Sequence, residues 1–312
     1  MIRLLFLVSI VLCAAMLLHG CGTSITNDPP PPPPPEPELF ETLSFGDDAT
    51  FDVVTWNLQE FPRNNQATLD YAASAIMRLD ADVIAIQEIM NWAAFDLLVA
   101  SLDGFEGYHA TSDSYMDLGY IWRSESVSEV TFDEPLSGST PFPRHPLVMH
   151  LTHAGTEFVL VNNHLKCCGD GLLSSGDPQD EEYRRALACS MLDQWIREEA
   201  FGANLILLGD LNDKLDDSTA HNVFQIFLDD ADQYLFADMP LAYSDERSSW
   251  SWRLQSHLDH IMITDELFAS FAKPASEVLT IRMDQYLSDG LGEYNTNLSD
   301  HFPVGMRLDL TP

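Results

Sequence analysis

Eight polar residues between positions 57 and 301 each lie at the edge of a short apolar run: Asn57, Glu88, His164, Asp210, Asn212, Asp259, Asp300 and His301. Hard divalent cations prefer oxygen ligands, and Mg²⁺ is held by one or two carboxylates together with waters and substrate phosphate oxygens. Glu88 and Asp300 are natural ligands of this kind. Histidines beside carboxylates supply general acids and bases near neutral pH, since the pKa of an imidazole lies there. The neighbouring carboxylate fixes the tautomer of the imidazole. The set suits metal-assisted hydrolysis of a phosphoester.

Each of these residues alone has an ordinary structural explanation. An Asp after a strand is usually a turn or cap residue, a Glu in that place is usually solvated, and a single His is more often structural than catalytic. The joint pattern is much harder to explain in this way.

The surrounding residues predict the elements that must position these side chains. Apolar or β-branched runs bounded by Asn, Asp, Gly or Pro predict strands at 51–56, 83–86, 147–151, 158–161, 205–208, 258–263 and 304–308. Apolar residues on one face predict helices at 68–79, 92–102 and 181–199. Strands that alternate with helices indicate a layered α/β or α+β domain. Because sheet scaffolds assemble sites at strand ends, we expect the polar residues to share one site.

Six short motifs carry a family resemblance: TWNLQ at 55–59, IQE at 86–88, NNHL at 162–165, GDLN at 209–212, LDHI at 258–261 and SDHFPV at 299–304. In this order they resemble the endonuclease/exonuclease/phosphatase superfamily, which includes deoxyribonuclease I, exonuclease III, neutral sphingomyelinases and inositol-polyphosphate phosphatases. The resemblance spans about residues 51–310, and GDLN and SDHFPV are its specific parts. It implies an α/β fold, a four-layer sandwich of two packed mixed β-sheets flanked by helices, with the site at one edge.

The resemblance also implies how a metal and a phosphate would be held. Glu88 would bind the principal Mg²⁺, with Asn57 and Asp300 nearby, and Mn²⁺ or Ca²⁺ are alternative cations. Asp210 and Asn212 would orient the scissile phosphate and the attacking water.

The same resemblance implies roles for two histidines and one arginine. His301 would act as a general base oriented by Asp259, and His164 would protonate the leaving oxygen or stabilise charge on the phosphate. Apurinic endonucleases usually place a Tyr where this chain has His164, so base-excision repair is disfavoured. The FPRHP segment resembles the part of deoxyribonuclease I that presents an arginine to a phosphate, which makes Arg144 the expected clamp and Arg123 a weaker candidate.

The amino-terminal residues predict export and lipid anchoring. Arg3 precedes an apolar run at 4–18, and the sequence LHGC ends at Cys21, which is typical of a lipoprotein signal of residues 1–20 with Cys21 acylated. A simple cleaved signal and a short membrane helix are the alternatives. Residues 21–47 form a linker whose seven consecutive prolines predict a stiff stalk, and residues 48–312 form the catalytic domain. We therefore expect a monomeric bacterial lipoprotein outside the cytoplasm, at the outer membrane or cell surface.

The net charge is −34, with 15 basic against 49 acidic residues. This argues against binding nucleic acid through a basic surface, because affinity for phosphate backbones normally comes from Lys and Arg. A polyanionic substrate would have to be held locally, by a metal ion and a few arginines.

Three cysteines remain outside the predicted signal and its cleavage box, namely Cys167, Cys168 and Cys189. An exported protein meets an oxidising compartment, so we expect one disulfide, from Cys167 or Cys168 to Cys189. The loop that contains the first two cysteines shapes the substrate mouth or is simply a pinned turn. Trp250 and Trp252 are interpreted as packing residues, with stacking on a base or lipid headgroup as the alternative.

Four functions follow in order of preference. The first is an extracytoplasmic nuclease, because the Arg144 segment and export both fit the degradation of environmental nucleic acid. The second is a phosphodiesterase acting on sphingomyelin or another phospholipid, which fits membrane anchoring, and the third is a phosphatase acting on small polyphosphates. The fourth is a catalytically silent surface-binding lipoprotein, which the presence of every motif residue disfavours.

Overall fold

A computed structural model describes residues 39–111, 116–245, 249–250 and 256–311. The chain divides into the segment Met1–Pro37 and the domain Glu38–Pro312. The predicted signal, Cys21 and the proline run lie outside the described residues. Within the described ranges, no helix has the length and apolar character needed to cross a membrane.

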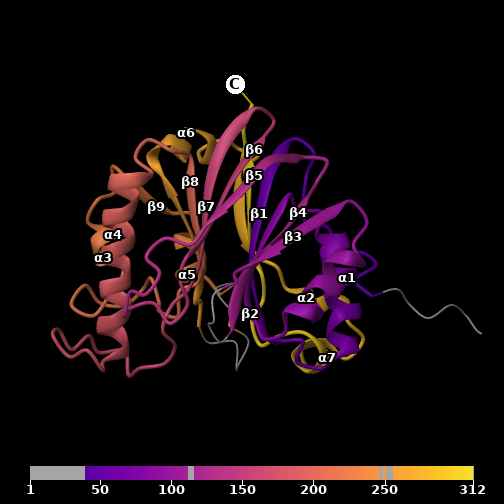
Figure 1. Ribbon diagram of the computed structural model, residues 1–312, viewed down its shortest axis with the longest axis horizontal. Coiled ribbons are helices and arrows are strands. Elements are labelled where there is room, and N and C mark those ends of the chain that lie inside the picture. The colour runs from indigo at the N-terminus through magenta and orange to yellow at the C-terminus, as the bar shows by residue number, and fades with distance from the viewer. Residues whose placement is uncertain (1–38, 112–115, 246–248, 251–255, 312) are drawn as a thin grey trace, which may run out of the picture. The chain divides into compact units, whose positions relative to one another are not determined.

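In the described part of the chain, twelve strands form two sheets of six strands each (Figure 1). The first sheet contains β1 (Thr50–Phe61), β2 (Val83–Ile89), β3 (Phe105–His109), β4 (Asp117–Arg123), β11 (Glu277–Thr280) and β12 (Val304–Asp309). The second contains β5 (Val127–Asp133), β6 (Leu147–His153), β7 (Thr156–His164), β8 (Leu205–Asp210), β9 (Tyr234–Phe236) and β10 (Asp259–Thr264). Their orders are β11-β12-β1-β2-β4-β3 and β5-β6-β7-β8-β10-β9.

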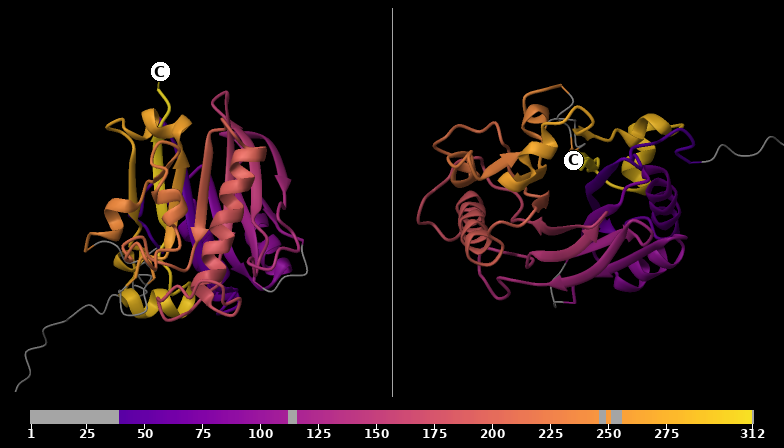
Figure 2. Two further views of the ribbon diagram at one scale, coloured as in Figure 1. Left: turned by 90° about the vertical axis from the view of Figure 1, so that its left-hand side faces the viewer. Right: turned by 90° about the horizontal axis from the view of Figure 1, so that it is seen from above.

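Helices cover the outer face of each sheet, as the view from above shows (Figure 2). The first sheet is covered by α1 (Gln66–Leu79), α2 (Trp92–Ala100) and α7 (Gly290–Asn297), and the second by α3 (Glu181–Glu199) and α4 (Gln225–Leu228). Shorter elements are α5 (Met239–Ala242), α6 (Phe268–Phe271) and the 3₁₀ helices η1 (Asp265–Leu267) and η2 (Met283–Tyr286). The molecule is therefore the predicted four-layer α/β sandwich of two mixed sheets flanked by helices.

Strand β1 shows why the sheets are buried on both faces. Phe51 and Val53 contribute to the cluster between the sheets, whereas Val54 and Trp56 contribute to the cluster under α1 and α2. Successive side chains of a strand point to opposite faces, so a strand covered on both faces contributes apolar residues to both sides. Between the sheets, the rings of Phe51 and Phe158 lie 4.4 Å apart, from centroid to centroid.

The folded domain begins earlier than the sequence predicts. Phe40, Leu43 and Phe45, which we expected in the proline-rich linker, are buried in the cluster under α1. These three residues therefore pack with the domain rather than extending as a linker. The domain contains all three apolar clusters of the described chain, so we expect it to fold by itself.

The topology brings the ends of six strands to one edge of the sandwich. Each sheet has a parallel pair near its centre, β1 with β2 and β7 with β8, and parallel neighbours end on the same side. Strand β10 runs antiparallel to β8 and therefore begins there, with Asp259 opposite Asp210. Strand β12 likewise begins opposite the end of β1. The polar residues that follow or precede these strands converge at this edge.

Candidate active site

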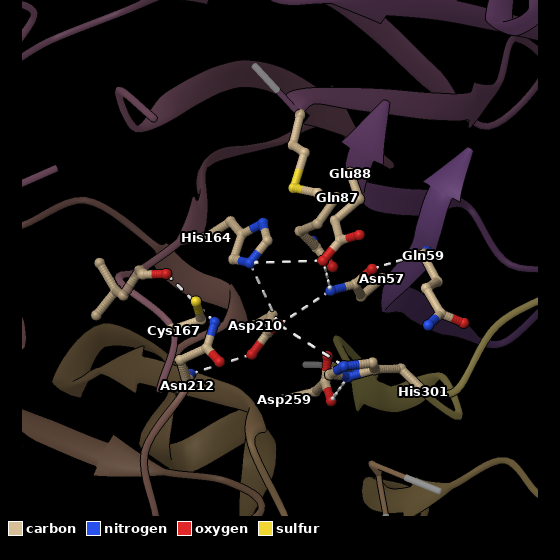
Figure 3. A network of polar contacts seen from close by, with 12 residues as sticks. Asn57, Gln59, Gln87, Glu88, His164, Cys167, Asp210, Asn212, Asp259 and His301 are labelled. Atoms are coloured by element: carbon tan, nitrogen blue, oxygen red, sulfur yellow. Dashed lines mark hydrogen bonds and ion pairs between the residues drawn. The ribbon is translucent and has the colours of Figure 1, made fainter. Parts of the chain in front are cut away.

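Asp210 lies at the centre of the site, at the end of β8, and its side chain is 2% exposed (Figure 3). Its Oδ2 accepts a hydrogen bond from Asn57 Nδ2 at 2.9 Å and lies 3.5 Å from His164 Nε2. The preceding Gly209 has φ +144°, and a Cβ there would lie 1.9 Å from the Asn163 carbonyl oxygen. Only glycine fits this backbone, which lets β8 approach β7 closely enough to deliver Asp210 to the site.

One amide joins the carboxylates of Asp210 and Glu88. Asn57 Nδ2 also donates to Glu88 Oε1 at 3.1 Å, and its Oδ1 accepts from the Gln59 backbone N–H at 2.9 Å. Glu88 has φ +66°, a left-handed conformation that costs a non-glycine residue about 1–2 kcal/mol. The Glu60 N–H donates to its Oε2 at 2.8 Å. Asn57, expected beside the metal, thus acts as a positioning residue for two carboxylates.

His301 and Asp259 form a buried pair. Asp259 Oδ2 lies 2.8 Å from His301 Nδ1, so the proton sits on Nδ1 and Nε2 faces Asp210 at 3.9 Å. Burial opposes protonation of His301, but the carboxylates of Asp259 and Asp210 outweigh it and raise the pKa of His301 to about 10. The expected orientation of His301 by Asp259 is present in the structure.

His164 has the opposite electrostatic environment. It is fully buried, and burial together with the positive charges of Arg144 and His301 lowers its pKa well below the usual value. Its Nδ1 has no hydrogen-bond partner among the described residues. Because its pKa is depressed, His164 is neutral at pH 7, whereas His301 carries a proton. The two imidazoles therefore serve different roles.

The donor atoms of the site fit a divalent cation. Ligand atoms of Glu88, His164 and Asp210 all lie within 4.8 Å of one another, and so do those of Asp210, Asp259 and His301. Burial and the negative charges of Asp259 and Glu88 outweigh His301 and Asn57, and the pKa of Asp210 rises to about 7. Carboxylates crowded in this way gain from a bound cation, and oxygen-rich ligand sets suit Mg²⁺ or Mn²⁺.

Two predicted site residues lie at the margin. The backbone N–H of Asn212 donates to Asp210 Oδ1 at 3.1 Å, and its side-chain amide donates to the Leu165 carbonyl at 3.2 Å. Asp300 lies beside His301, with Oδ1 3.9 Å from its Nε2. The Asp300 carboxylate, expected among the metal ligands, belongs to neither group of converging ligand atoms.

The two arginine candidates lie at opposite ends of the sandwich. Burial lowers the pKa of Arg144, and the carboxylates of Glu88 and Asp210 are near enough to oppose this shift. Its Nε is buried without a hydrogen-bond partner among the described residues. Arg123 instead ends β4 on the far side and pairs with Asp80. Arg144 is therefore part of the site and Arg123 is not.

A cavity of about 380 Å³ opens beside the candidate site residues. Glu88, His164, Asp210 and His301 form part of its lining, and Cys167 and Trp250 contribute to its wall. Trp250 thus lines this cavity, while Trp252 lies outside the described residues. A larger hollow of about 600 Å³ elsewhere contains none of the predicted catalytic residues.

A buried amide pair connects the two sheets behind the site. Gln87 Nε2 donates to Asn162 Oδ1 at 2.8 Å, and Asn162 Nδ2 donates to the carbonyls of Ile86 and Gly119, both at 3.0 Å. Gln87 precedes Glu88 on β2, and Asn162 lies two residues before His164 on β7. The pair therefore fixes the distance between catalytic residues of different sheets. Both residues belong to the sequence motifs, although no separate role was predicted for them.

The sequence analysis missed a second buried network, around Asp238. Asp238 Oδ2 lies 2.8 Å from His257 Nε2 and 2.6 Å from His260 Nδ1. His260 Nε2 lies 2.9 Å from the Asp213 carbonyl oxygen, so both ring nitrogens of His260 face acceptors and both carry protons. Burial opposes each charge, but the mutual attraction lowers the pKa of Asp238 and raises that of His260.

We expect Asp238→Asn to lower the free energy of unfolding by about 3–5 kcal/mol, because it leaves the charge of His260 buried without its partner. Asp238 contributes stability above its ordinary pKa of 3.8, and that contribution is lost as the pH falls through its lowered folded value. His260 contributes fully below 6.5, and that contribution is lost as the pH rises through its raised folded value. Urea unfolding at pH 5–6 measures the effect, with the exposed Asp103→Asn as control. A loss no larger than that of the control would contradict this assignment.

The predicted disulfide is wrong. Cys167, Cys168 and Cys189 are all free thiols. Cys189 is buried in the apolar cluster between α3 and the second sheet, whereas Cys168 is exposed in the loop after β7. The Cys189 thiol faces the core from its helix, so it packs among apolar side chains and does not reach the surface loop.

Comparison with known proteins follows from this geometry. The sequence model of the Endonuclease/Exonuclease/phosphatase family matches residues 54–301. No curated protein sequence matches the chain.

Solved structures share the fold at low sequence identity. D. rerio TDP2 complexed with single strand DNA product is 19% identical with a TM-score of 0.61, covering 84% of this chain and 99% of that one. The human Nocturnin catalytic domain with bound sulfate anion is 16% identical with a TM-score of 0.57, covering 84% and 95%. A family protein from Bacteroides thetaiotaomicron is 14% identical with a TM-score of 0.56, covering 84% and 99%.

Proposed function

Because the chain belongs to the endonuclease/exonuclease/phosphatase family, we propose that it uses a divalent metal ion to hydrolyse phosphodiester bonds of nucleic acid outside the cytoplasm. The family generally performs metal-dependent phosphoester hydrolysis. The observation that carries the proposal is the position of Asp210, within 4 Å of Asn57, His164 and His301 and beside Glu88. A carboxylate buried beside other carboxylates is unfavourable unless a bound cation neutralises part of the charge.

The residues that would hold the metal are Glu88 and Asp210, whose carboxylate oxygens converge. A bound Mg²⁺ or Mn²⁺ supplies positive charge that stabilises the developing charge on the phosphate. Asn57 holds both of these side chains in place.

His301 would accept the proton of the attacking water through Nε2, because its Nδ1 is occupied by Asp259. The pKa of about 10 reflects the uncompensated carboxylates around it. With a cation held beside Asp210, the pKa of His301 would fall towards neutrality, where an imidazole acts as a base. Asp259 then stabilises the imidazolium that forms.

His164 would contact the phosphate as a neutral hydrogen-bond donor. Its depressed pKa keeps it uncharged, so it stabilises negative charge by hydrogen bonding rather than as an ion. This favours charge stabilisation over protonation of the leaving oxygen, the two roles left open for it.

Two observations and the predicted location support nucleic acid as the substrate. Arg144 lies beside the carboxylate site with a buried Nε that has no partner among the described residues. TDP2, which shares the fold, has been seen with a single strand DNA product. The predicted export and predicted acylation of Cys21 would give a nuclease access to environmental nucleic acid, and the net charge of −34 would limit binding to local contacts. We propose a monomeric lipoprotein anchored through Cys21.

We expect Arg144→Gln to raise KM for a phosphodiester by about 10–100-fold, because a charge-assisted hydrogen bond contributes about 1.5–3 kcal/mol. Initial rates measured over a range of bis(p-nitrophenyl) phosphate concentrations give KM and kcat separately. Arg123→Gln is the matched control. Arg123 ends β4 at the side of the sandwich away from the site, so this variant should leave KM unchanged. Equal effects of both variants would remove Arg144 from the substrate site.

The substrate class is tested on the domain from residue 39, with Mg²⁺ and plasmid DNA, RNA, sphingomyelin and inositol polyphosphate as competing substrates. Cleavage of DNA or RNA at rates well above the other substrates supports the nuclease. Preference for sphingomyelin would replace it with the phospholipid phosphodiesterase. Absence of EDTA-sensitive turnover on all four would leave a surface-binding protein with the same fold.

A further inference from the structure

The sulfur atoms of Cys167 and Cys168 lie 3.0 Å apart at the wall of the active-site cavity. This is about 1 Å longer than a disulfide bond. Side chains of adjacent residues in an extended chain point to opposite sides. Cys168 has φ +73°, a left-handed conformation that turns its side chain to the same side as that of Cys167.

One buried arginine holds the backbone of the loop that carries the two thiols. Arg185 Nη1 donates to the carbonyls of Lys166 and Cys168 at 2.6 and 2.8 Å, and its Nε donates to Asp213 at 2.8 Å. At Gly169, which has φ +108°, a Cβ would lie 2.1 Å from a Glu182 carboxylate oxygen. The backbone on both sides of the pair is therefore fixed, and the two sulfurs are held together.

The chemistry of the two thiols differs from that of Cys189. Cys168 donates a hydrogen bond to Cys167 Sγ, which raises the pKa of Cys168, and Lys166 Nζ lies 3.8 Å from Cys167 Sγ. A sulfur that accepts a hydrogen bond beside an ammonium group is the better nucleophile of such a pair. Cys189 is fully buried, which raises its pKa and excludes oxidants.

We propose that Cys167 and Cys168 are a thiol-modification site, which closes into a vicinal disulfide at the mouth of the active site when a disulfide oxidant reaches it. The Cys167 thiolate attacks one sulfur of the oxidant R–S–S–R, which releases RS⁻ and forms a mixed disulfide. The Cys168 thiol then loses its proton and attacks the Cys167 sulfur, which releases the second RS⁻. The two thiols are oxidised, the oxidant is reduced to two thiols, and the protons of the cysteines balance the two thiolates.

The disulfide would form at the wall of the cavity that Glu88, His164, Asp210 and His301 also line. The chemical modification of the two thiols does not rest on the proposed function.

The test uses the domain from residue 39, which contains Cys167, Cys168 and Cys189 and no other cysteine. It is treated with oxidised glutathione, denatured, alkylated with iodoacetamide and digested with trypsin. Cleavage after Lys166 and Arg184 gives a peptide of residues 167–184 that contains both cysteines of the pair, while Cys189 lies in residues 186–197. We expect the first peptide to be lighter by two hydrogen atoms and to carry no alkyl group, and the Cys189 peptide to be alkylated once.

Two matched variants complete the experiment. Cys168→Ser should stop at a mixed disulfide of glutathione on Cys167, and Cys189→Ala should still close the ring. Two alkyl groups on residues 167–184 after oxidation, or a link to Cys189, would overturn the proposal. A closed ring in a protein without turnover would refute the proposed function and leave the modification site supported.

Discussion

Replacing His301 with alanine is expected to lower kcat for phosphodiester hydrolysis by about 10²–10⁴-fold, the usual contribution of a positioned general base. The imidazole is held by Asp259 with Nε2 directed at Asp210, so the variant loses the group that accepts the proton of the attacking water. Single-turnover and steady-state rates on bis(p-nitrophenyl) phosphate measure the effect. KM should change little, because His301 is not proposed to bind the ground-state phosphate.

His150→Ala is the matched control for this variant. His150 also pairs with an aspartate, Asp133, at 3.1 Å, but it lies on β6 with its side chain 41% exposed. Its replacement should leave kcat unchanged. If His301→Ala retained the wild-type kcat while its circular dichroism matched that of the wild type, His301 would not be the base.

Asp210→Asn is expected to lower kcat by about 10²–10³-fold, because it removes a central charge around which the metal and phosphate are arranged. The amide keeps the shape of the carboxylate and changes only its charge and hydrogen bonding. The affinity for Mg²⁺, measured by titration calorimetry, should fall in parallel. A variant with wild-type kcat and wild-type Mg²⁺ affinity would place the metal elsewhere.

The same variant has an opposite effect on stability. The folded pKa of Asp210 is raised from 3.8 to about 7, so the folded state binds this proton more tightly than the unfolded state. Stability from this group is therefore lost as the pH rises from about 4 to about 7. In EDTA at pH 8, Asp210→Asn should have a higher free energy of unfolding than the wild type, and at pH 4 the two should agree. A destabilised variant at pH 8 would show that Asp210 is not strained by its neighbours.

The elements that carry the site were predictable because their local sequence patterns agree with the pairing and packing found in the fold. Helix α3 has the predicted bounds Glu181–Glu199, and its N-cap Asp180 accepts from the Tyr183 N–H. The seven predicted strands are present, and β7 and β8 extend further than their apolar runs because His164 and Asp210 continue the parallel register. The sequence pattern does not indicate a strand at such polar ends, although pairing with the neighbouring strand keeps them extended.

The strands that were missed include an edge strand with a weak pattern and a buried strand that a glycine interrupts. Strand β5 is an edge strand with one exposed face, and its pattern alternates weakly. Strand β4 contains Gly119, at which a Cβ would lie 2.6 Å from the Ile89 side chain. Such positions are set by contacts between distant segments, which a local pattern does not contain.

The long-range polar partners could not be predicted for the same reason. Asp238 has no motif around it, yet it is fully buried between His257 and His260. Arg185 lies within a helix whose charged residues are typical of a solvated face, and only the fold shows that it is buried against Asp213. Whether a charged side chain is buried depends on what the fold places opposite it, and this is absent from the local sequence.

The measurement that tests the central claim most directly is metal-dependent hydrolysis of bis(p-nitrophenyl) phosphate by the domain from residue 39. The protein is dialysed against EDTA, assayed, and assayed again after Mg²⁺ or Mn²⁺ is restored. The proposed site predicts that hydrolysis disappears with EDTA, returns with the cation, and is slower by at least about 10²-fold in His301→Ala with the cation restored. Hydrolysis that persists in EDTA, or that His301→Ala retains at the wild-type rate, would contradict it.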